Sequence, residues 1–231
     1  MRGLRQILFL FCLLLGIAGC SWFNFFGSDE ESKESDTYQK GLEAYQKKKY
    51  DNAIKHFRSV SPKSPNYSKT LRLIEQIPMQ RAEKAVAQKD YNTAMQELDK
   101  ITEGNSNYSK AQKLKTKVYY ESALVNYEKA SSSMRIPALE ELAKVAVETN
   151  NRENILRTIE MIGDELNQST KAPDISQLIT LLHSTVEPTR DSEVIHVGLE
   201  HAFQAYERFN TQPRLRNQLL RLIAALKIKL Q

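Results

Sequence analysis

Between residue 37 and about residue 130 the chain repeats with a period of 41, and this repeat constrains the fold more than any other feature of the sequence. The tetrapeptide Asn66–Lys69 recurs as Asn107–Lys110. The same offset pairs small, aromatic and aliphatic residues: Gly41 and Ala82, Ala44 and Ala85, Tyr50 and Tyr91, Ala53 and Ala94, Phe57 and Leu98, Val60 and Ile101. One helical hairpin cannot bury its apolar face alone, so repetition at this length indicates units that stack on their neighbours.

Local signals favour helices along the whole body of the chain. The chain has only eight glycines, which leaves little material for tight hairpins, and no alternation of period two indicates strands. Helical spacing continues from Tyr67 to Ala85 across Pro78, which indicates one kinked helix or two abutting ones. We therefore predict an all-α fold.

Residues 137–231 lack the repeat signature but keep helix signals. We expect Pro137 to open a helix, Asn150 or Asn151 to cap the next, Asp191 to cap a later one and Pro213 to open the last. Apolar residues at helical spacing fill these segments: Leu139, Leu142, Val145 and Ala146; Ile155, Ile159 and Ile162; Ile175, Leu178, Ile179 and Leu182; Val194, Val197 and Phe203; Leu215, Leu219, Leu222, Ile223, Leu226 and Leu230.

Residues 41–57 resemble a tetratricopeptide repeat. The matching positions are small, aromatic, small and bulky in turn: Gly41, Tyr50, Ala53 and Phe57 in the first copy, and Ala82, Tyr91, Ala94 and Leu98 in the second. The family period is 34, so each unit here is about seven residues, or two helical turns, longer. In a third copy Ala123 and Leu139 persist, but Ser132 and Arg135 replace the tyrosine and the alanine. The resemblance implies a right-handed solenoid of helical hairpins.

The first twenty residues resemble the signal peptide of a bacterial lipoprotein. Arg2 and Arg5 precede an apolar run over residues 7–15, and the lipobox-like Ile17-Ala18-Gly19-Cys20 follows. The resemblance implies cleavage before Cys20 and lipidation of its thiol, after which no cysteine is left for a disulfide or a metal. Two or three acyl chains anchor a protein stably. In enteric bacteria an aspartate after that cysteine retains lipoproteins in the inner membrane, and Ser21 stands here instead, which favours the outer membrane.

Charge is distributed unevenly along the chain. Residues 28–36 hold five acids and one lysine, as in a solvated spacer. The formal charge of the whole chain is +5, but residues 37–231 alone carry 30 basic and 23 acidic residues. This basic body suits an acidic partner or anionic lipid, and no motif for nucleic-acid binding occurs.

The sequence contains no motif for catalysis. A phosphate loop, a nucleophile elbow and a dinucleotide fingerprint are all missing. His196 and His201 are five residues apart, whereas a zinc pair on one helix face needs a spacing of three or four. We therefore expect no enzyme, no cofactor, no metal site and no small-molecule substrate.

Two surfaces are candidates for binding a partner. The tetratricopeptide resemblance implies a groove that holds an extended peptide or a helix, lined by Tyr38, Leu42, Tyr45, Met79, Glu83, Val86, Tyr120, Leu124 and Tyr127. The alternative is that these residues pack against the next hairpin. The second surface is basic: no acid follows Glu207, and six cations do, namely Arg208, Arg214, Arg216, Arg221, Lys227 and Lys229. That segment either contacts an acidic partner or anionic membrane, or is a capping helix whose late lysines complement its dipole.

Together these patterns predict four segments: a signal peptide (1–19), a lipidated cysteine with its spacer (20–36), tetratricopeptide-like repeats (37–130) and a C-terminal helical extension (131–231). The expected function is a lipid-anchored periplasmic scaffold at the outer membrane that binds envelope proteins, similar in layout to lipoproteins that serve as pilotins or in barrel assembly. The alternative is an envelope protein whose basic surface recognises cell-wall glycan or anionic lipid.

Overall fold

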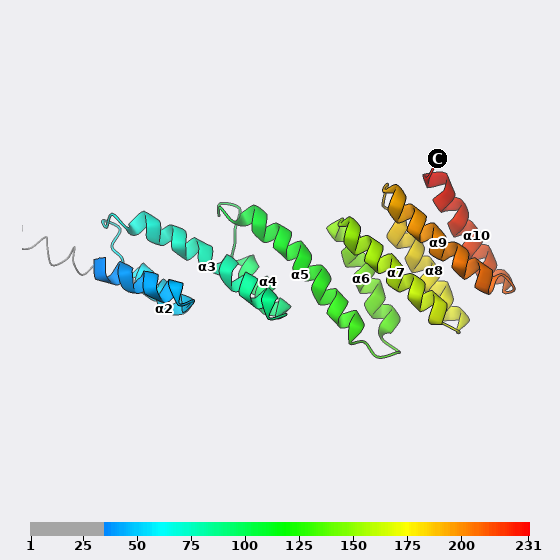
Figure 1. The fold of residues 1–231 in the computed structure, drawn as a ribbon, viewed down its shortest axis with the longest axis horizontal. Coiled ribbons are helices and arrows are strands. Elements are labelled where there is room, and N and C mark those ends of the chain that lie inside the picture. Colours follow the sequence, from blue (N-terminus) through cyan, green and yellow to red (C-terminus); the bar gives the residue numbers. More distant parts are fainter. Residues whose placement is uncertain (1–34) are drawn as a thin grey trace, which may run out of the picture. The chain divides into compact units, whose positions relative to one another are not determined.

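The computed structural model describes residues 35–231, and within this range the chain consists of α-helices joined by short turns, with no strand (Figure 1). The predicted all-α fold is confirmed. The signal peptide, Cys20 and most of the acidic spacer lie outside the described residues. The last two spacer residues, Ser35 and Asp36, are already helical, and Asp36 pairs with Lys40 at 2.6 Å. None of the described helices is long and apolar enough to cross a membrane.

Helical residues 35–46 precede the helices labelled in Figure 1. The labelled helices are α2 (Tyr50–Arg58), α3 (Tyr67–Ala87), α4 (Tyr91–Asp99), α5 (Tyr108–Glu128), α6 (Arg135–Thr149), α7 (Arg152–Gln168), α8 (Ala172–Val186), α9 (Ser192–Phe209) and α10 (Pro213–Lys229). Of the two alternatives at Pro78, the structure has the single helix, because α3 continues through the proline.

The chain divides into two compact units. Unit 1 contains the residues up to Glu83 together with Asp99–Tyr108, and unit 2 contains Lys84–Leu98 together with Ser109–Gln231. This division differs from the boundary that we expected between residues 130 and 131. The physical reason is that the apolar side chains of α5 are buried in one core with those of α6–α10.

Unit 1 buries the repeat residues Tyr50, Ala53 and Phe57 of α2 together with Ile77 of α3. Gly41 permits the close approach of the first helix, since a Cβ atom there would lie 2.5 Å from the Phe57 ring. The turn before α2 contains Lys48 in the left-handed conformation, and Lys89, 41 residues later, has the same backbone conformation before α4. The repeat in the sequence is therefore also a repeat in local structure.

In unit 2, each of the helices α6–α8 packs against the next helix and against the one after it, and α9 packs against α10. Side-chain bonds between alternate helices join residues that are 41 or 42 apart: His201 to Glu160, Arg208 to Asn167, Gln218 to Ser176 and Lys229 to Glu187. A spacing close to the sequence period thus continues through α7–α10, where the sequence shows no repeat signature. This stacking is the helical-repeat-like arrangement that the sequence predicts.

The helix signals of the C-terminal half are largely confirmed. Asp191 caps α9 by accepting hydrogen bonds from two backbone N–H groups, and Pro213 is the first residue of α10. Asn151 caps α7, whereas Asn150 ends α6 in the left-handed conformation. Helix α6 begins at Arg135, two residues before the proline that we expected to open it.

The helix that carries Val194, Val197 and Phe203 is present as α9, but the three residues do not share one face. Phe203 is 39% exposed. Phe203 lies nine residues after Val194, or two and a half turns along a straight helix, and so points away from the core.

Candidate partner-binding surfaces

The first predicted groove residues, Tyr38, Leu42 and Tyr45, pack against the core of unit 1. The rings of Tyr38 and Tyr45 lie 6.2 Å and 6.4 Å from the ring of Phe57. The Tyr45 hydroxyl accepts a hydrogen bond from Gln80 and donates one to Gln76 at 3.2 Å, and burial raises the pKa of Tyr45. These residues therefore join the first helix to α2 and α3.

In the second copy the three predicted groove residues do not share one environment. Met79 is buried, Val86 is half-buried and Glu83 is exposed.

The third set, Tyr120, Leu124 and Tyr127, is buried in the core of unit 2. The Tyr120 hydroxyl donates to the backbone carbonyl of Asn154 at 3.2 Å. Their burial agrees with the alternative that these residues pack against the next hairpin, and not with an open groove lined by all three. The physical reason is that the residues after the third copy form α6 and α7, which cover this face of α5.

Tyr127 belongs to a polar cluster that connects α5, α6 and α7. Its hydroxyl donates to the Glu165 carboxylate at 2.8 Å, Arg135 also donates to that carboxylate, and the Arg135 guanidinium lies 4.9 Å from the centre of the Tyr127 ring. Burial, with the neighbouring Glu165 carboxylate, raises the pKa of Tyr127 to about 12. A buried carboxylate needs such partners, so the cluster fixes how these three helices meet.

The predicted basic surface divides into two groups. Arg208 donates to backbone carbonyls at the end of α7, including Leu166 at 3.0 Å, and Lys229 donates to those that follow α8, including Thr189 at 2.9 Å. These two cations cap the C-terminal ends of helices in unit 2, where a positive charge interacts favourably with the helix dipole and with the last carbonyls. All six cations are exposed, and the second group consists of the other four: Arg214, Arg216, Arg221 and Lys227.

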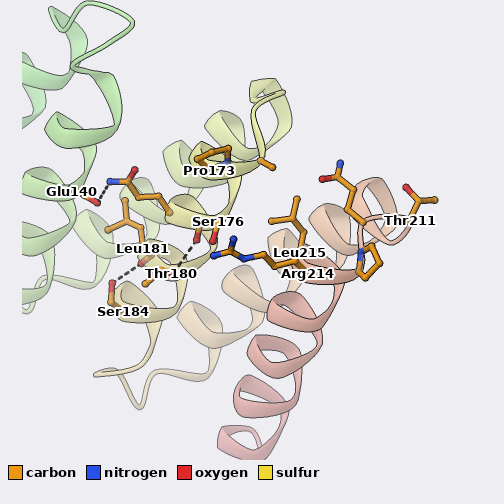
Figure 2. Close-up of a pocket in the computed structure, with 13 residues that line it drawn as sticks. Glu140, Pro173, Ser176, Thr180, Leu181, Ser184, Thr211, Arg214 and Leu215 are labelled. Atoms are coloured by element: carbon orange, nitrogen blue, oxygen red, sulfur yellow. Dashed lines mark hydrogen bonds between the residues drawn. The ribbon is translucent and has the colours of Figure 1, made fainter.

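A groove that the sequence did not reveal lies in unit 2, where α8 passes between α6 and the start of α10 (Figure 2). Its volume is about 840 Å³. The floor is one face of α8, with positions spaced by three and four: Pro173, Ser176, Gln177, Thr180, Leu181 and Ser184. Glu140 of α6 lines the groove, as does Arg214 of α10.

Hydrogen bonds inside the groove fix the orientation of its polar side chains. Gln177 donates to the Glu140 carboxylate at 2.6 Å. The hydroxyls of Thr180 and Ser184 each donate to a carbonyl of their own helix at 3.0 Å. Because their protons are used in this way, these hydroxyls present acceptor lone pairs, while Arg214 presents donors. A polypeptide backbone, which offers both N–H and C=O groups, matches such a lining.

The spacing of the small polar residues on α8 is a signal that sequence reasoning missed. Ser176, Thr180 and Ser184 recur every four residues on the side of the helix away from its buried leucines. A polar stripe alone indicates only a solvated helix face. The groove exists because the neighbouring helices rise on either side of it.

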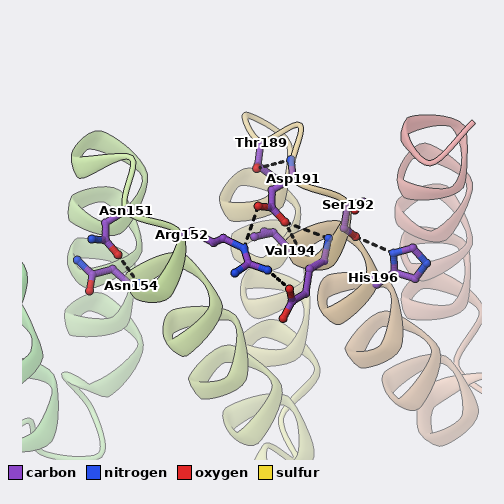
Figure 3. Close-up of polar contacts among 9 residues, drawn as sticks. Asn151, Arg152, Asn154, Thr189, Asp191, Ser192, Val194 and His196 are labelled. Carbon is purple, nitrogen blue, oxygen red and sulfur yellow. Dashed lines mark hydrogen bonds and ion pairs between the residues drawn. The ribbon is translucent and has the colours of Figure 1, made fainter.

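A second polar cluster fixes the N-terminal ends of α7 and α9 (Figure 3). Arg152 pairs with Asp191 at 2.9 Å and also with Glu193. His196 is bonded to the carbonyl of Ser192 at 2.6 Å. In residues 35–231 no group of three or more His, Cys, Asp and Glu side chains is placed to hold a metal ion. The ion pairs of Arg152 hold the two helix ends together, while the His196 bond lies within α9.

Comparison of the chain with protein-family models, with characterised proteins and with solved structures gave no match.

Proposed function

We propose that the protein is a lipid-anchored adaptor at the periplasmic face of the bacterial outer membrane, which binds partner proteins through a right-handed solenoid of helical hairpins. The lipobox-like Ile17–Cys20 and the serine that follows it support the anchor and its membrane. The cross-helix bonds at offsets of 41 and 42 residues support the solenoid, because they join α9 to α7 and α10 to α8 at nearly the same spacing.

The groove along α8 is the observation that carries this proposal. It is open to solvent and follows α8 for almost four helical turns. Its lining contains hydrogen-bond acceptors along α8 and a donor, the Arg214 guanidinium. An extended segment of a partner would lie along α8 with its backbone amides directed at Thr180 and Ser184. A carboxylate of that segment would lie against Arg214, because guanidinium and carboxylate groups form strong paired hydrogen bonds.

The experiment that tests this proposal is photo-crosslinking in intact cells of the source bacterium. A photoreactive amino acid replaces Thr180 in the groove, and a matched control replaces Asp164, which is exposed on α7. We expect a specific envelope protein to be captured from position 180 and not from position 164. The adduct should weaken in a Gln177→Ala/Arg214→Ala variant whose helical circular dichroism is unchanged.

Two results would contradict the adaptor proposal. One is the same set of adducts from positions 180 and 164, which would indicate random encounters. The other is a groove adduct that survives the Gln177→Ala/Arg214→Ala substitutions at full yield, since the proposed contacts would then contribute nothing.

A further inference from the structure

We infer that the outer face of α10 is a contact site for an anionic lipid surface. This inference does not depend on the groove along α8 or on the protein partner proposed for it. It rests on three observations in unit 2, which are an exposed apolar stripe, the cations that flank it, and the way in which the helix is held.

The apolar stripe follows one side of α10. Leu220, Ala224 and Ile228 are spaced by four residues and therefore lie above one another on the helix. Leu220 is 44% exposed and Ile228 is 69% exposed. Phe203 of the neighbouring α9 extends this surface, since the Lys227 ammonium lies 5.1 Å from the centre of its exposed ring. The three stripe residues of α10 span about 12 Å of helix at 1.5 Å per residue.

Three cations border the stripe on both sides. At 100° per residue, Arg216 and Lys227 lie along one edge of Leu220, Ala224 and Ile228, and Arg221 lies along the other. All three are exposed, and within residues 35–231 none of them forms an ion pair with a carboxylate. No acidic residue occurs after Glu207. An apolar stripe with cations on both of its edges is the pattern of a helix that lies in the interface of an anionic membrane.

The opposite face of α10 holds the helix in place. Leu215, Leu219 and Leu222 are buried in the core of unit 2. Because α10 is already folded and anchored in the core, little conformational entropy is lost when its outer stripe contacts a membrane. Arg208 and Lys229, which cap other helices, are excluded from this surface.

Charge complementarity selects the occupant. A second copy of the same face would bring Arg216, Arg221 and Lys227 against their own like charges, which opposes self-association. Anionic headgroups would pair with all three cations while the stripe entered the boundary of the acyl chains. Glu200 and Glu207 lie on the same side of α9 as Phe203 and would be repelled, so the contact is shallow and centred on α10.

A position-specific fluorescence measurement on the full chain tests this inference. The chain contains two cysteines, and in a Cys12→Ser/Cys20→Ser background an Ala224→Cys substitution places an environment-sensitive dye in the stripe. A matched Glu141→Cys variant carries the dye at an exposed position of α6. Vesicles consist of phosphatidylcholine alone or mixed with phosphatidylglycerol, each with a spin-labelled quencher lipid. We expect a blue shift and quenching at position 224 with the mixed vesicles, and neither change at position 141.

Substitution of the three cations measures how much they contribute to vesicle binding. Each cation near an anionic membrane contributes about fivefold to binding, so Arg216→Gln/Arg221→Gln/Lys227→Gln should weaken the vesicle contact at position 224 on the order of 100-fold. Lys144→Gln, at an exposed position on α6, should leave it unchanged. Raised salt should weaken the wild-type contact in the same direction.

Three outcomes would overturn the inference. Equal quenching at positions 224 and 141 would mean that the vesicles meet no particular face. A contact that is unchanged in the triple variant would remove the role of the cations. A blue shift that appears with soluble polyglutamate but not with vesicles would assign the face to an acidic protein instead.

Discussion

The close approach at Gly41 leads to a prediction about Gly41→Ala. A Cβ atom at this position would lie 2.5 Å from two carbons of the Phe57 ring, whereas ordinary contacts begin near 3.4 Å. Phe57 is only 1% exposed, so its ring cannot turn into solvent to make room. The chain resolves the same crowding differently in its second copy, which has Ala82 and Leu98 at the equivalent positions.

The magnitude follows from two opposing effects. Overpacking a buried site costs about 1–3 kcal/mol. Alanine in place of glycine inside a helix contributes about 1 kcal/mol in the other direction. Gly41→Ala alone should therefore lower the free energy of unfolding by up to about 2 kcal/mol. In a Phe57→Leu background the obstructing ring is gone, and the same substitution should raise that free energy by about 1 kcal/mol.

The assay is a double-mutant cycle on Gly41→Ala and Phe57→Leu. Urea unfolding followed by far-ultraviolet circular dichroism gives the four free energies, and hydrogen exchange of α2 reports on unit 1 separately. We expect a coupling of about 1–3 kcal/mol between the two substitutions. Effects that add within about 0.5 kcal/mol would refute the argument, because they would show that residue 41 does not press on the ring.

Three further predictions concern the polar contacts and the anchor. Tyr127→Phe should lower the free energy of unfolding by about 2 kcal/mol, since it removes a hydrogen bond to the charged Glu165, while Tyr119→Phe at a 55% exposed position should change it by less than about 0.5 kcal/mol. The pKa of Tyr127 is raised to about 12 in the folded protein, so the contribution of its neutral form to stability is complete below pH about 10. That contribution is lost as the pH rises from about 10 to about 12. In urea titrations the free energies of unfolding of the wild type and of Tyr127→Phe should therefore converge over that range. Arg208→Ala should lower stability by about 1 kcal/mol and speed hydrogen exchange in the last turn of α7, and unchanged exchange there would contradict the capping role. Cys20→Ser should move the chain from the membrane fraction to the soluble fraction of lysed cells, and retention in the membrane fraction would contradict the lipid anchor.

Much of the fold could be predicted from the sequence because the signals involved are local. Helical spacing of apolar residues identified each segment of the C-terminal half, and Asp191 and Pro213 marked where α9 and α10 begin. Such signals act within a few residues, since a capping side chain bonds to N–H groups two or three positions later. They left a choice open between Asn150 and Asn151, of which Asn151 caps α7, and they placed the start of α6 two residues late, at Pro137.

The candidate surfaces were predicted less well, because whether a helix face stays open to solvent depends on which other helix packs against it. The family resemblance places Tyr120 and Tyr127 on an open face, yet α7 lies against that face and bonds to both hydroxyls. Likewise, a count of cations does not distinguish Arg208, which caps α7, from Arg221, which lies on the outer face of α10.

By itself, the sequence determined the helical class, the starts of α7, α9 and α10 and the 41-residue period, all of which follow from local patterns along the chain. Only the tertiary structure decided that α5 shares a core with the later helices, that a similar spacing continues in α7–α10, and that a groove opens along α8. The physical reason is that these features come from contacts between residues about 30–42 positions apart, formed when helices stack and bury one face of each against another.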